Sequence, residues 1–138
     1  MNVNGYEIKP FTNLAGADLK GANLKGADLE GANLEGAKLR GAKLRGADLR
    51  CASLYAADLE GADLRYADLE DANLVNANLR GADLTGAVLV DANLRDAKLE
   101  GTILEKKEEP QDDKDPKIKE LEEEVKKYKD TLKDLLNS

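Results

Sequence analysis

The sequence predicts an all-β solenoid followed by a C-terminal α-helix. Three observations support this prediction. Leucine recurs at every fifth position from Leu14 to Leu104, which makes nineteen repeats. The residue two before each leucine is alanine in all seventeen repeats from Ala17 to Ala97. After the repeats, apolar residues recur instead in alternating steps of three and four, the spacing of one face of a helix.

Residues 1–11 precede the first repeat and are expected to form an N-terminal cap or an incomplete first coil. They hold Tyr6, Ile8, Pro10 and Phe11, and this phenylalanine is the only one in the chain. A solenoid exposes the apolar interior of its end coil unless another segment covers it. A short apolar segment directly before the first repeat is suited to that task.

Residues 12–105 form the repeat region, whose unit reads Ala-(Asp/Asn)-Leu-X-Gly. The first three residues alternate apolar, polar and apolar, which places alanine and leucine on one face of a short extended segment. The next two suit a turn, because glycine tolerates positive φ. Extended segments joined by bends make polygonal coils, and stacked coils pair as parallel strands. Seven repeats lack the glycine and are expected to use a different turn type: Cys51, Ala56, Tyr66, Asp71, Asn76, Asp91 and Asp96 stand in its place.

The repeat closely resembles the pentapeptide-repeat family, with Ala17-Asp18-Leu19-Lys20-Gly21 and its eighteen neighbours carrying the match. The chain is similar to the short members found in cyanobacteria, here with an added C-terminal helix. This resemblance implies a right-handed quadrilateral parallel β-helix with four pentapeptides in each coil. Nineteen repeats would then give about five coils, a rod roughly 20 to 25 Å long at about 4.8 Å per coil.

A coil of twenty residues converts the sequence into vertical columns. One inward column is expected to form a core ladder of leucines: Leu19, Leu39, Leu59, Leu79 and Leu99. Two outward columns alternate in charge, namely Arg40, Glu60, Arg80, Glu100 and Glu30, Arg50, Glu70. Ion pairs between successive coils should help to set the register, although each exposed pair contributes only a few tenths of a kcal/mol.

The outer surface gains apolar residues in the later repeats. Tyr55 and Val75 share one column, and Val88 and Val90 belong to the neighbouring side. These four residues are a candidate patch for a protein partner. The alternative is that they are the scattered surface hydrophobes that most proteins carry.

Residues 106–114, KKEEPQDDK, are charged and without periodicity, which indicates a linker. An amphipathic helix is predicted over residues 115–138, with Asp115 as its N-cap and Pro116 at its first position. Its stripe consists of Ile118, Leu121, Val125, Tyr128, Leu132 and Leu135. Two interpretations remain open. The helix either folds back to cap the last coil or pairs with the same helix of a second chain as a coiled coil. We favour the homodimer through residues 115–138.

Composition restricts the functions that this chain can have. Histidine is absent, which removes His-centred catalysis and His metal ligands, and Cys51 is the only cysteine. We therefore expect no enzyme activity, no cofactor and no metal site. The net charge is −7 and the basic residues are interspersed with acids, so we expect no basic stripe and no direct nucleic-acid binding. Neither a signal sequence nor a membrane-spanning stretch is evident, and a cytoplasmic location is expected.

Two functions are therefore predicted. The first is a non-catalytic structural scaffold that displays side chains to a protein partner. The alternative follows from the family resemblance, because some members are acidic rods that imitate DNA and inhibit or protect DNA gyrase. Against this alternative, residues 11–105 hold 16 acidic and 11 basic residues, which is a diluted charge for a DNA mimic.

Overall fold

The computed structural model describes residues 1–104 and 116–136. Its regular elements are two short strands, β1 (Asn2–Val3) and β2 (Tyr6–Glu7), and one helix, α1 (Pro116–Leu136). The chain divides into two compact units, Met1–Lys106 and Lys107–Ser138. The predicted linker, residues 106–114, lies outside the described residues.

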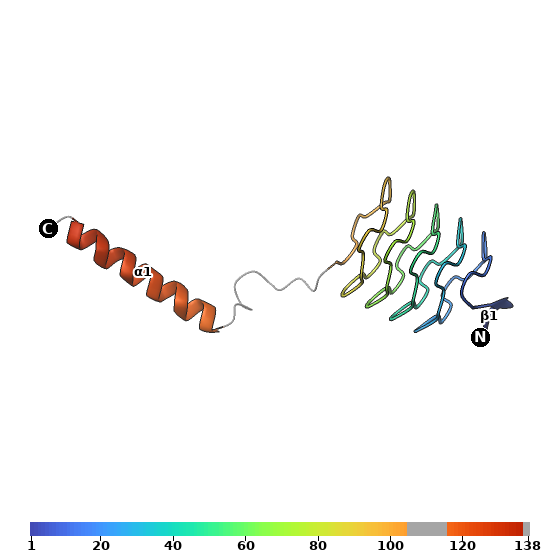
Figure 1. Ribbon diagram of the computed structural model, residues 1–138, viewed down its shortest axis with the longest axis horizontal. Coiled ribbons are helices and arrows are strands. Elements are labelled where there is room, and N and C mark those ends of the chain that lie inside the picture. The colour runs from blue at the N-terminus through green and yellow to red at the C-terminus, as the bar shows by residue number, and fades with distance from the viewer. Residues whose placement is uncertain (105–115, 137–138) are drawn as a thin grey trace. The chain divides into compact units, whose positions relative to one another are not determined.

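The repeat region winds into stacked coils in which residues twenty apart are neighbours (Figure 1). Parallel bridges join each coil to the next, as in the pair Asp18 and Lys38. They form four columns, which we call sides one to four. The columns start at Asn13, Asp18, Asn23 and Asp28 respectively. The coil is therefore four-sided, with one pentapeptide on each side.

Backbone hydrogen bonds explain why three extended residues are enough for each side. The N–H of Leu39 donates to the carbonyl of Asp58 in the next coil at 2.7 Å, and the N–H of Asp58 donates back to Ala37 at 3.0 Å. At the corner, the N–H of Ala42 donates to the carbonyl of Leu39 at 3.0 Å and closes a turn. Each side is thus stabilised by the coils above and below rather than by strand length.

The residue at the glycine position is in the left-handed region in every described coil, whether or not it is glycine. Gly36 has φ 63°, and Ala56, which replaces glycine in the next coil of the same column, has φ 55°. The expectation of a different turn type at the seven substituted positions is therefore wrong. The stacked coils impose one backbone path, and residues such as Ala56 and Tyr66 adopt it at a local steric cost.

The core is a column of leucine and alanine along the inside of the coils. Leu19, Leu39, Leu59 and Leu79 of the expected core ladder have 0% exposure. Leu99, the fifth member, is 45% exposed, because it belongs to the last coil and no further coil stacks on it. Among the described residues no polar or charged side chain is buried, so the interior provides packing alone.

The N-terminal end of the coils is covered by the β1–β2 hairpin. The strands are antiparallel and joined by Asn4-Gly5, both with positive φ, as a two-residue hairpin turn requires. Ile8 is buried, and Val3 and Tyr6 pack against the core. Phe11 differs from its companions because it already occupies the turn position of the first repeat, where it is 74% exposed.

The C-terminal end of the same unit presents apolar surface. Burial falls through the last coil, where Ala87, Leu89 and Leu94 are partly buried. Ile103 and Leu104 are exposed together with Leu99. The two ends of the core therefore differ: one carries a hairpin and the other leaves leucine side chains accessible.

Helix α1 begins at the proline that was predicted as its first residue. The apolar side chains of its stripe that are described are exposed, from Leu121 and Val125 at 51% to Tyr128 at 70%. The side chain of Ile118 lies outside the described set. No helix among the described residues is long and apolar enough to cross a membrane.

Candidate functional site

The polar residue before each leucine stabilises the local backbone. The Oδ1 atom of Asn23 accepts a hydrogen bond from the N–H of Lys25 at 3.3 Å, and Oδ1 of Asp63 accepts from the N–H of Arg65 at 3.2 Å. This is an Asx turn, in which a short side chain bonds to the backbone two residues on. It explains why the repeat prefers Asp or Asn at this position.

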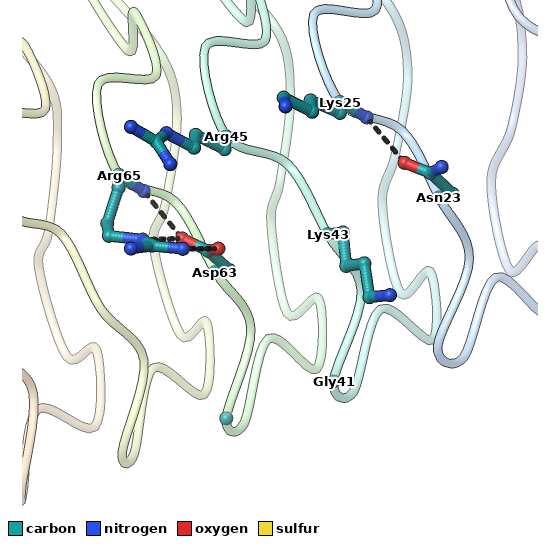
Figure 2. A pocket seen from close by; sticks show the side chains of 8 residues that line it. Asn23, Lys25, Gly41, Lys43, Arg45, Asp63 and Arg65 are labelled. Carbon is teal, nitrogen blue, oxygen red and sulfur yellow. Dashed lines mark hydrogen bonds and ion pairs between the residues drawn. The ribbon is translucent and has the colours of Figure 1, made fainter.

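Side three carries a hollow with a volume of about 510 Å³. We call it the basic hollow. Figure 2 shows that its side chains come from three successive coils. It is lined by Asn23, Lys25, Gly41, Lys43, Arg45, Gly61, Asp63 and Arg65. The two glycines lack side chains and so leave the space open. Four of the lining residues are cationic and one is anionic, in a chain of net charge −7.

Arg65 and Asp63 form the one tight ion pair of the basic hollow. Nε of Arg65 lies 2.8 Å from Oδ1 of Asp63, and Nη2 lies 2.7 Å from Oδ2. These side-chain hydrogen bonds hold the pKa of Asp63 below its usual value, with a smaller Coulombic contribution from Arg45. The pKa of Arg65 is raised in return, chiefly by its hydrogen bonds to Asp63. Both groups therefore stay charged across the neutral range.

Arg45 is oriented by an aromatic ring rather than by an acid. Its guanidinium carbon lies 5.4 Å from the centre of the Tyr66 ring, within the range of a cation–π contact. Tyr66 in turn lies over Gly86 of the next coil. Among the described residues Arg45 makes no ion pair, and neither do Lys25 and Lys43. Lys25, Lys43 and Arg45 are thus not bound directly by an acid, although Arg45 and Asp63 attract each other at longer range.

Elsewhere on the coils, opposite charges do meet. Arg40 pairs with Glu60 at 3.1 Å and Arg80 with Glu100 at 3.1 Å, as the alternating column predicts. On side four, Arg50 pairs with Asp48 at 2.8 Å and with Glu30 at 3.4 Å. All but the Arg50–Asp48 pair link successive coils, and all of them neutralise charge locally.

Three carboxylates on side four lie close enough together to share a cation, namely Asp28, Glu30 and Asp48. The guanidinium of Arg50 already bonds to two of them. Its positive charge compensates the cluster, and the pKa of Asp48 is lowered chiefly by the hydrogen bonds from Arg50. The cluster therefore forms an ion-pair network with Arg50.

The candidate apolar patch falls on two sides of the coil. Tyr55 and Val75 follow the leucines of side one, whereas Val88 and Val90 flank Leu89 on side four. Val90 is 57% exposed, and the Tyr55 hydroxyl accepts a hydrogen bond from the side chain of Asn76. Cys51 is exposed at a turn.

The expectation that no basic stripe exists is wrong for side three. Lys25, Arg45 and Arg65 occupy the same position in successive coils, and Lys43 stands beside them. The signal was present in the sequence as a column of like charge at twenty-residue steps. It was missed because acids and bases alternate along the chain itself.

The repeat region matches the family described as "Pentapeptide repeats (8 copies)". The matched segments are residues 12–50, 27–65, 52–89 and 67–105. Together they cover more than half of the chain. The chain belongs to the pentapeptide-repeat family.

Other pentapeptide-repeat proteins of known structure resemble this one. The protein alr5209 of Nostoc PCC 7120 is 42% identical, with 68% of this chain and 81% of that chain covered and a TM-score of 0.57. Rfr23 of the cyanobacterium Cyanothece 51142 is 31% identical, with 70% and 84% covered and a TM-score of 0.37. A comparison with curated proteins gave no match.

Membership of the pentapeptide-repeat family implies a right-handed quadrilateral β-helix. The four columns of parallel bridges agree with a quadrilateral coil. In such a coil the repeat keeps the interior constant, while the residue after each leucine varies. Within the coils, the side chains that differ most from repeat to repeat therefore face outward.

Proposed function

We propose that this chain is a non-catalytic scaffold that binds a protein partner through the outer surface of its coils. The observation that carries the proposal is the division between interior and surface. The described interior is leucine and alanine without a buried polar group, whereas the outward positions vary from coil to coil. A fixed frame with variable side chains is typical of repeat proteins that bind other macromolecules.

The composition and the surface both support a non-catalytic function. The sequence contains no histidine, and its single cysteine is exposed at a turn. The acidic side chains with lowered pKa, such as Asp48 and Asp63, are engaged by arginines in ion pairs. They have the environment of structural pairs rather than that of a general acid held in a cleft.

The proposal includes a homodimer formed through α1. Its described stripe is exposed, and three heptads of apolar residues on one face suit pairing with a second copy. A paired scaffold would present its binding surface twice. This gives a gain in avidity when the partner is also repeated or dimeric.

Light scattering on the full chain and on a chain ending at Glu105 tests the assembly. The truncated chain retains the whole core of the first unit, so it should fold. A dimer predicts a molar mass of twice 14.9 kDa for the full chain and a monomer for the truncated chain. A monomeric full chain together with an aggregating truncated chain would instead assign α1 to capping the last coil.

Gyrase binding is the alternative, and the acidic net charge is the observation in its favour. The basic hollow counts against it, because it interrupts the negative surface that a DNA mimic needs. A gyrase supercoiling assay with added protein tests this function. Inhibition or quinolone protection at micromolar concentration would replace the scaffold proposal.

A further inference from the structure

The basic hollow breaks the charge compensation seen on the rest of the coils. Arg50 and Arg65 are each held by a neighbouring acid. Lys25, Lys43 and Arg45 stand on two adjacent coils of one side, and among the described residues no acid contacts them directly. Arg45 is attracted to Asp63 only at longer range. Like charges at this spacing repel, so the fold gains no stability from the arrangement. An external anion would relieve the repulsion.

The basic hollow also offers an unoccupied backbone donor. In the preceding coil the side chain of Asn23 accepts a hydrogen bond from the backbone N–H of Lys25. In the following coil the side chain of Asp63 accepts one from the N–H of Arg65. Lys43 occupies this position in the middle coil and has no acceptor atom in its side chain. The N–H of Arg45 is therefore without a protein acceptor in the described structure.

We propose that the basic hollow docks an acidic stretch of a protein partner. One carboxylate of that stretch replaces the missing Asx side chain by accepting the N–H of Arg45. Lys43 and Arg45 neutralise this carboxylate, and Lys25 meets a second one. The inference rests on the proposed scaffold function and deepens it, because it states which side binds and which chemistry is recognised.

Three features favour an acidic peptide over other anions. The three cations that no acid holds directly stand on two adjacent coils, about 5 Å apart at about 4.8 Å per coil, rather than directed at one point as a single phosphate would require. An extended peptide places same-side residues about 7 Å apart, and the long lysine and arginine side chains can reach two carboxylates at that spacing. Beyond Arg65 the same side continues with Asp83, which would repel a longer polyanion such as nucleic acid.

Fluorescence anisotropy with a labelled hexaglutamate peptide and the full chain at moderate salt tests the proposal. The double variant Lys43→Glu/Arg45→Glu should weaken binding by about tenfold or more, because it reverses both central charges. The matched control Arg95→Glu/Lys98→Glu changes the net charge equally on exposed residues outside the hollow. We expect the control to change the affinity by less than about twofold at moderate salt, where distant charges are screened.

A second pair of variants tests the backbone donor. Lys43→Gln and Lys43→Asn each remove one charge, but only asparagine is short enough to restore the Asx turn and occupy the N–H of Arg45. We therefore expect Lys43→Asn to bind the peptide more weakly than Lys43→Gln. Equal affinities of the two variants would contradict docking at this N–H.

Other results would overturn the proposal as a whole. One is that the unaltered chain does not bind the peptide. Another is that the two charge-reversal double variants lose affinity for the peptide equally. A six-nucleotide oligothymidylate that binds more tightly than the peptide would assign the basic hollow to nucleic acid. Competition by inorganic phosphate as effective as by the peptide would assign it to small anions. Light scattering does not depend on the basic hollow, so failure here leaves the test of assembly intact.

Discussion

One backbone position in each repeat determines which side chains the coil can accept without strain. Glycine is free of steric cost at positive φ, Asn and Asp tolerate it, and Ala or Tyr adopt it at a cost of about 1 kcal/mol or more. Gly36, Ala56 and Asn76 occupy this position in successive coils of one column, all with φ between 55° and 63°. Glycine, alanine and asparagine can therefore be compared at the same backbone position within one column.

Opposite substitutions in that column should have opposite effects on stability. We expect Gly36→Ala to lower the free energy of unfolding by about 1 kcal/mol, through strain alone, because an added Cβ would meet no neighbouring atom. Ala56→Gly should remove the same strain, offset in part by the greater entropy of glycine in the unfolded chain. Urea unfolding measures both changes. A loss of stability in Ala56→Gly would contradict the strain argument.

The ion pair of Asp63 and Arg65 should give stability that acid removes. The folded pKa of Asp63 lies below that of a free aspartate, so its contribution is present above the free value and is lost as the pH falls through the folded pKa. Asp63→Asn should cost about 0.5 kcal/mol at neutral pH and nothing once the carboxyl is protonated. Unfolding free energies measured at neutral pH and at a pH well below the pKa of a free aspartate test this, with Asp18→Asn as a control that keeps an Asx acceptor.

A single side of the coil is too short to be stable as an element. Each has one bridged residue per coil and depends on neighbours twenty residues away for its hydrogen bonds. Helix α1 is the opposite case, because its hydrogen bonds are internal and only its apolar stripe needs a partner. The same chain thus combines an element formed by stacking with one formed locally.

Pairing of α1 should be sensitive to a charge on its stripe. Val125→Asp places a carboxylate at the centre of the proposed dimer contact and should convert the full chain to a monomer by light scattering. Lys127→Asp introduces the same side chain outside the stripe and should leave the dimer intact. If both variants remain dimeric, the contact between the two copies is elsewhere.

At the scale of the whole first unit, stability is distributed along a one-dimensional stack. The hairpin covers the first coil and the central coils are enclosed, whereas burial falls toward the last coil. The cost of removing a leucine should therefore depend on its place in the stack. The core ladder tests this with one residue type at one position of the coil.

Leu59→Ala should be far more damaging than Leu99→Ala. Leu59 is fully buried, so truncation leaves a cavity and costs about 2 to 5 kcal/mol. Leu99 is 45% exposed in the last coil, so we expect a cost of about 1 kcal/mol. Thermal unfolding of the chain ending at Glu105 measures the difference without α1. Equal costs would mean that the last coil is covered in solution, for example by self-association.

Most of the fold could be predicted from the repeat, because leucine and alanine at fixed places in five residues must face one side of each extended segment. The C-terminal helix could be predicted in the same way from its own spacing. The turn at Ala56 could not be predicted, because alanine disfavours positive φ. Only the hydrogen bonds between coils impose this backbone conformation. The columns were accessible once a coil of twenty residues was assumed.

The sequence by itself determined what faces inward, since the five-residue period allows leucine and alanine no other common surface. Tertiary structure alone decided which outward residues are neighbours. Lys25, Lys43 and Arg65 are separated along the chain by many acids, and they share one hollow only because four sides close each coil. The number of sides depends on how leucines pack around a common axis, a property of many repeats together. For this reason the core was predictable from the five-residue repeat, whereas the basic column could be recognised only through the twenty-residue coil.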